Sequence, residues 1–66
     1  MVLKKIEIIG TSPDAFYKAV ENAVKEAAKT VRDMKWVEVT KLGAKIKGEE
    51  ITEFKATVKI AFEVER

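Results

Sequence analysis

Trp36 is the residue whose type and position most favour a binding role in this chain. It lies in a stretch with the alternation of a strand, where Val37 and Val39 are expected to face a helix. Because successive strand residues point to opposite faces, Trp36 should lie on the outer face beside Glu38 and Thr40. An outward tryptophan among polar residues fits either a subunit contact, since aromatic residues are enriched in interface cores, or a stacking platform for a flat ligand.

Lys55 is the second candidate, because the period of two places it on the same outer face. An aromatic plate from Trp36 and a polar arm from Lys55 could then meet. Taken alone, Lys55 also fits an ordinary solvated surface lysine.

The turn Gly10-Thr11-Ser12 precedes an expected helix, whose free backbone N–H groups could hold an anion. The turn lacks the further glycines of a dinucleotide-binding loop and the lysine of a P-loop, so ordinary helix capping is favoured. The chain has no Cys and no His to act as thiol nucleophile or imidazole base, and Ser12 is better used as a cap. We therefore expect no enzyme.

A group of glutamates near the expected hairpin turn, Glu49, Glu50 and Glu53, could bind a hard cation such as calcium. The segment lacks the spaced oxygen ligands of an EF-hand, so a solvated run of charge is the favoured interpretation.

The pattern of elements predicts an α+β fold. A strand is expected over Leu3–Ile9, and a helix is expected to start with Ser12 as N-cap and Pro13 at the first helical position and to end near Arg32 or Asp33. The apolar stripe of this helix comprises Phe16, Val20, Ala23, Val24, Ala27 and Val31. A long hairpin should follow, Lys35–Lys47 and Ile51–Val64, joined across Gly48-Glu49.

Residue parity predicts how the hairpin packs. Apolar residues in the last strand fall at even positions, whereas those of the middle strand change from odd, Val37 and Val39, to even at Leu42. A bulge near Lys41–Gly43 would restore the phase. The order β-α-β-β then permits a three-stranded antiparallel sheet with the last strand in the centre and one helix over the even-numbered face, all in a single domain, residues 1–66.

Length and composition bound the class of protein. A chain of 66 residues buries a thin core, and without Cys or His it lacks disulfides and most structural metal sites, so oligomerisation is the expected source of stability.

A net charge of +2 with interspersed signs disfavours nucleic-acid binding. Without an apolar run long enough for a span or a signal peptide, we expect no membrane association and a cytoplasmic location. A Lys- and Glu-rich chain without Gln suggests a hot environment.

Four segments together resemble the dodecins, small flavin-binding proteins. The segments are Lys5–Ser12, Trp36–Val39, Glu53–Lys55 and Val58–Phe62, and their spacing matches over essentially the whole chain. The resemblance implies a hollow homododecamer in which the outer faces of the sheets become subunit contacts. It also implies flavin sites at twofold interfaces, where a pair of isoalloxazine rings lies between two tryptophans.

By this resemblance, riboflavin or FMN stacks on Trp36, and we assign Lys55 and Glu38 to the same site. The implied role is to store and buffer flavin and to limit its photochemistry. Flavin-binding members commonly carry a glutamine where this chain has Lys55, and an ammonium offers donors only, whereas an amide offers a donor and an acceptor. The resemblance leaves an alternative, an oligomer of the same family that binds ions such as calcium, or coenzyme A, in place of flavin. A purely structural oligomer is the third interpretation.

Overall fold

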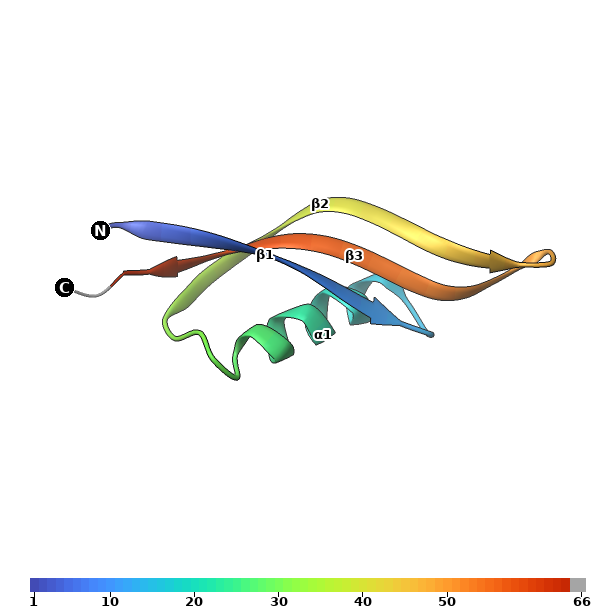
Figure 1. The fold of residues 1–66 in the computed structure, drawn as a ribbon, viewed down its shortest axis with the longest axis horizontal. Coiled ribbons are helices and arrows are strands. Elements are labelled where there is room, and N and C mark those ends of the chain that lie inside the picture. The colour runs from blue at the N-terminus through green and yellow to red at the C-terminus, as the bar shows by residue number, and fades with distance from the viewer. Residues whose placement is uncertain (65–66) are drawn as a thin grey trace.

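The computed structural model describes residues 1–64, so Glu65 and Arg66, the last two positions of the expected domain, lie outside the described residues. Its elements follow the order β1 (Leu3–Ser12), α1 (Phe16–Ala27), β2 (Met34–Lys47) and β3 (Glu50–Glu63) (Figure 1). This order confirms the predicted β-α-β-β fold. Within the described part of the chain, no helix has the length and apolar character needed to cross a membrane.

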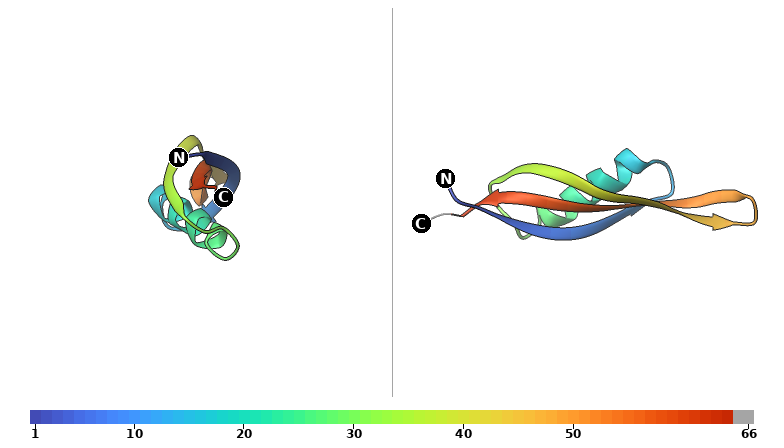
Figure 2. Two further views of the ribbon diagram at one scale, coloured as in Figure 1. Left: turned by 90° about the vertical axis from the view of Figure 1, so that its left-hand side faces the viewer. Right: turned by 90° about the horizontal axis from the view of Figure 1, so that it is seen from above.

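The three strands form one antiparallel sheet in the order β1-β3-β2, so β3 lies in the centre as predicted. Figure 2 shows that α1 runs beneath one face and that the β2–β3 hairpin continues well past it. The molecule is accordingly elongated, with extents of 51 × 19 × 13 Å. Phe54 of β3 still packs against Phe16 of α1, but the end of the hairpin beyond it has no helix beneath.

The strand register confirms the change of parity in β2. Val39 pairs with Val58 and Lys41 pairs with Thr57, so Thr40 is the extra residue of a bulge. This bulge lies one residue before the predicted Lys41–Gly43 segment. The Thr40 hydroxyl donates a hydrogen bond to the Thr57 carbonyl oxygen (3.1 Å), so the Thr40 side chain is engaged at the bulge. Thr40 therefore does not continue the row of side chains that Trp36 and Glu38 begin on β2.

Two further register shifts, which the residue pattern did not predict, lie between Met34 and Trp36 and between Lys45 and Ile46. Each shift adds local twist to the hairpin.

The predicted start of the helix is wrong. The helix begins at Phe16, and Ala15 occupies the N-cap position with extended backbone and no side-chain cap. Ser12 instead ends β1, where it pairs with Phe54, and its hydroxyl oxygen accepts a hydrogen bond from the Asp14 N–H (3.0 Å). Ser12 thus closes the turn between strand and helix. The pairing of β1 with β3 continues past the expected strand end at Ile9 as far as Ser12.

The predicted end of the helix near Arg32 or Asp33 is also wrong. The last helical residue is Ala27, whose carbonyl oxygen accepts hydrogen bonds from the N–H groups of both Thr30 and Val31 (3.1 and 2.8 Å). Asp33 then adopts a left-handed conformation with φ of 60°, which a continuing α-helix does not allow. The chain needs this turn to bring β2 back along β3.

The core between α1 and the sheet consists mainly of small side chains. Ala19, Ala23 and Ala27 of α1 are buried, and the cluster they form includes Val58 and Ile60 of β3. The predicted stripe missed Ala19, which has no exposed surface, whereas the larger residues of the stripe, such as Val20 and Val24, are only partly buried.

Gly10 lets the helix approach β1 closely. A Cβ atom at this position would lie 2.9 Å from the Cβ of Ala23 and would also collide with the carbonyl oxygen of Ala19. Both neighbours belong to a packed helix and cannot move independently, so a side chain at Gly10 would displace α1 from the sheet.

We predict that Gly10→Ala lowers the free energy of unfolding by about 3 kcal/mol, at the upper end of the usual cost of overpacking. The control is Gly43→Ala, where the nearest atom to the new Cβ would be Lys55 Cε at 3.7 Å, an ordinary contact. Chemical denaturation at equal protein concentration measures both. Equal stability of the two variants would show that the helix does not depend on close contact at Gly10.

Candidate functional site

The sheet face that points away from α1, here called the outer face, carries the odd-numbered residues of β3. Trp36 pairs with Ala61 and Glu38 pairs with Lys59, so both lie on this face as predicted. Trp36 retains 65% of its surface exposed. A large aromatic side chain that is two-thirds exposed on a strand is available for contact with a ligand or a second chain.

The surroundings of Trp36 are small and charged. Ala61, its neighbour on β3, is 3% exposed, and Lys5 of β1 pairs with Ala61 from the other side. The Lys5 ammonium lies 3.4 Å from the Glu38 carboxylate, so this ion pair spans the central strand beside the tryptophan. The site therefore combines an apolar ring surface with donor and acceptor groups close by.

This arrangement suits the stacking of a planar ring, since an aromatic face binds another π-system and the polar groups at its edge can orient it. The charged groups near Trp36 on this face include Lys5, Glu38 and Lys59, which pairs with Glu38. Glu49, Glu50 and Glu53 are not brought together, since no group of three or more candidate metal ligands forms within residues 1–64.

Lys55 lies on the outer face as predicted, but far from Trp36. It pairs with Gly43 on β2 and Thr11 on β1. Its position on β3 is six residues from Ala61, which at about 3.3 Å per residue is a separation of roughly 20 Å. The expected meeting of Trp36 and Lys55 within one chain is therefore wrong, because the distance exceeds the combined reach of the two side chains.

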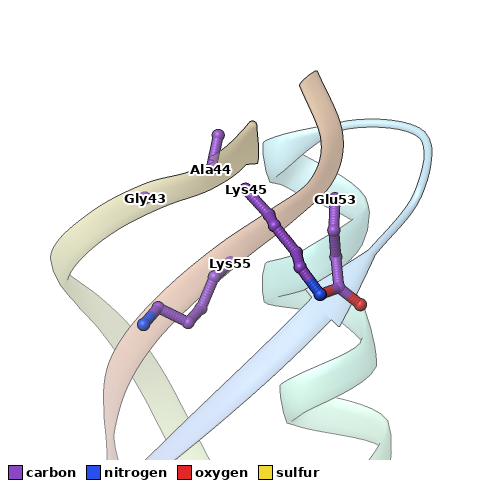
Figure 3. Close-up of a pocket in the computed structure, with 5 residues that line it drawn as sticks. All are labelled: Gly43, Ala44, Lys45, Glu53 and Lys55. Atoms are coloured by element: carbon purple, nitrogen blue, oxygen red, sulfur yellow. The ribbon is translucent and has the colours of Figure 1, made fainter. Parts of the chain in front are cut away.

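Lys55 lines a recess between β2 and β3, in the half of the hairpin nearer its turn (Figure 3). It has a volume of about 360 Å³ and is lined by Gly43, Ala44, Lys45, Glu53 and Lys55. The stem of Lys55 runs over Gly43, with Cε 3.7 Å from where a Gly43 Cβ would lie. Sequence reasoning linked Gly43 only to the bulge, although a glycine inside a strand also marks a close approach or an open space.

The turn Gly10-Thr11-Ser12, the weaker candidate for an anion site, is held by its own polar groups. The Ser12 hydroxyl binds the Asp14 N–H, and the Asn22 side-chain amide donates to the Thr11 carbonyl oxygen (2.8 Å). These bonds give the turn a structural role.

Comparison with known proteins places the chain in a family. The dodecin family model matches residues 2–65. The chain is 31% identical over 64 residues to the dodecin of Thermus thermophilus, covering 97% of this chain and 93% of the relative. The chain belongs to the dodecin family.

Solved structures of dodecins share its fold. Dodecin from Streptomyces coelicolor superposes with a TM-score of 0.93 at 34% identity, covering 98% of this chain and 93% of the other. The tt0972 protein from Thermus thermophilus gives 0.94 at 31% identity, covering 98% and 96%. Dodecin from Streptomyces davaonensis gives 0.93 at 25% identity, covering 98% and 96%.

This dodecin chain leaves large apolar side chains exposed on both faces of its sheet. On the outer face Ile9 is 57% exposed, and on the opposite face Leu42 is 56% exposed. Near the hairpin end Ile46 and Ile51, which pair with each other, are 69% and 53% exposed. The helix covers mainly β1 and β3, so the apolar side chains of β2 lack a cover within the chain.

We predict that the Lys5–Glu38 pair contributes little to stability. Both side chains are 58% exposed, and exposed pairs are worth about 0–1 kcal/mol after solvent screening. Glu38→Gln should therefore lower the unfolding free energy by less than about 0.5 kcal/mol. Glu26→Gln, which breaks the exposed helix pair with Lys29, is the matched control. A loss above about 1.5 kcal/mol for Glu38→Gln alone would assign the pair to the fold.

Proposed function

We propose that this dodecin binds a flavin, riboflavin or FMN, by stacking the isoalloxazine ring on Trp36 within a homododecamer. It would act without catalysis, in keeping with a family of small binding proteins, and without a nucleic-acid or membrane partner. The observation that carries the proposal is the 65% exposure of Trp36 on a face where the adjacent position is only alanine. A flat ring can lie against the indole there, and Glu38 with Lys5 can meet its polar edge.

The exposed apolar side chains support assembly. A chain of this length has a small core, and its buried side chains are mostly alanines, with Ile60 and Val58 the largest that are fully buried. Ile9, Leu42 and Ile46 are 57%, 56% and 69% exposed, so burying the rest of each against other copies would add about 1–2 kcal/mol per side chain. We propose twelve copies by the resemblance to the dodecins.

A twofold arrangement also explains how Lys55 could belong to the same site. On one chain Lys55 lies roughly 20 Å from the position of Trp36, but twofold symmetry reverses the strand direction of a second copy. Lys55 of one copy can then approach Trp36 of the other. The proposed site is therefore incomplete in a single chain.

The role we propose for the bound flavin is storage and buffering. An indole stacked closely on the flavin ring quenches the excited state of the flavin, and this quenching limits photochemical damage. The alternative of calcium binding has less support, since the glutamates near the hairpin turn form no three-ligand group in residues 1–64. Coenzyme A binding is tested by titrating the protein with coenzyme A alongside riboflavin.

We predict that the folded protein is a closed oligomer of twelve copies. Native mass spectrometry at micromolar concentration should give a mass about twelve times the 7.4 kDa of the chain. A stable folded monomer under these conditions would contradict the proposed assembly.

We predict that Trp36→Ala weakens riboflavin binding at least about tenfold, because stacking on an aromatic side chain is worth roughly 1–3 kcal/mol. Quenching of riboflavin fluorescence measures the affinity. Tyr17→Ala is the matched control, since Tyr17 is equally exposed (63%) but lies on the helix. If Trp36→Ala dissociates the oligomer while the remaining oligomer quenches riboflavin normally, Trp36 is a subunit contact and the proposed site is wrong.

A further inference from the structure

We infer that the end of the β2–β3 hairpin is an arm that packs on a second copy of the chain, against the helix side of that copy's β2. The hairpin arm comprises residues 45–53. The surface that it contacts, here called the β2 strip, comprises Val37, Val39 and Leu42. The inference rests on the proposed assembly, and it names a contact on the opposite side of the sheet from the flavin site.

The β2 strip is an apolar surface that the helix leaves uncovered. Its three residues pair with Ile60, Val58 and Ala56 of β3, which are buried under α1. The strip is therefore on the helix side of the sheet. In chain order, its residues nevertheless keep 37%, 45% and 56% of their surface exposed.

The strip is uncovered because the helix is offset toward β1. The Asn22 side-chain amide donates a hydrogen bond to the Thr11 carbonyl oxygen of β1 (2.8 Å), so this flank of α1 faces β1. At about 100° per residue, Val20 and Val24 lie on the opposite flank, toward β2, and both are only partly buried. The strip and this flank of the helix together form one apolar surface.

The hairpin arm carries an exposed apolar pair of its own. Ile46 and Ile51 lie directly opposite each other and are 69% and 53% exposed. Ile46 is two residues beyond Ala44, which pairs with Phe54. Phe54 packs on Phe16 of α1, so alternation places the pair on the helix side. Figure 1 shows the arm extending past the end of α1.

The arm cannot cover the strip of its own chain. Ile46 is seven residues from Val39 on the same strand, a separation of roughly 20 Å. Arm and strip are also different surfaces, so a contact between copies is heterologous, and such contacts close into rings. The twofold contact proposed at the outer face joins only two copies. A closed assembly of twelve needs a second contact of this kind.

The charges at the two ends of β2 favour the same contact. The turn of the arm, residues 47–50, contains one lysine and two glutamates, a net charge of −1. The segment before the strip, residues 29–35, contains three basic residues and one acidic residue, a net charge of +2. An arm that lies along the strip with its turn toward this segment brings opposite charges together, which fixes its direction.

The first test places a charge on the arm. Ile46→Glu should remove the twelve-copy species from native mass spectra at micromolar concentration, because a carboxylate buried without a partner is strongly disfavoured. Circular dichroism should still show the sheet, since Ile46 is largely exposed within one chain. The control is Val2→Glu, which places the same charge on a 48% exposed residue outside both surfaces, and it should keep twelve copies.

The second test uses the absence of cysteine from the sequence. The double variant Val39→Cys/Ile46→Cys is treated with a short bismaleimide, which cannot span the roughly 20 Å between the two positions of one chain. Because each copy then makes two links, a denaturing gel should show a ladder beyond the dimer. Neither single variant should give linked products. Should Ile46→Glu fail to fold, this crosslinking decides the inference.

The inference is overturned if Ile46→Glu keeps twelve copies, or if Val2→Glu dissociates the assembly as fully as Ile46→Glu. It is also overturned if the double cysteine variant gives no ladder. None of these measurements uses a flavin. An assembly that links through the arm but does not bind riboflavin would therefore contradict the proposed flavin site and leave the arm contact in place.

Discussion

The contact between Gly10 of β1 and the alanines of α1 determines how the rest of the structure is arranged. Because Gly10 has no side chain, the backbone of the helix at Ala19 and Ala23 can lie directly against the strand. The helix is held over β1 and β3, and much of β2 and the end of the hairpin beyond Phe54 are left without a cover. This placement leaves apolar side chains exposed, and the proposed assembly would bury them against other copies of the chain.

The same placement leaves the outer face of the sheet open along its whole length. Trp36 with Ala61 and the Lys5–Glu38 pair occupy one end, and the recess around Lys55 occupies the other. In a single chain Trp36 and Lys55 are therefore too far apart to contact one ring together. The proposed symmetric assembly would join the two ends from different copies, which links the proposed binding function directly to the proposed oligomer.

Much of this fold was predictable from local rules. The order of the elements predicted the central position of β3, and the alternation around Val37 and Val39 predicted the face of Trp36. The parity change after Val39 predicted a bulge to within one residue. The helix bounds were wrong because Ser12 and Asp33 are governed by tertiary pairing and a left-handed turn, which propensity does not report. The separation of Trp36 from Lys55 was missed because parity gives the face of a residue but not its position along the strand. The flavin ligand, the twelvefold assembly and the hot-environment origin stay predictions.

The central claim, a flavin stacked on Trp36, is tested most directly by the intrinsic fluorescence of the protein. The chain contains a single tryptophan, so its emission reports on this position alone. Riboflavin added to the wild type should quench most of that emission in a saturable way, with an end point of one riboflavin per chain. Riboflavin that binds the protein while tryptophan emission stays unchanged would contradict stacking at Trp36 and place the ligand elsewhere.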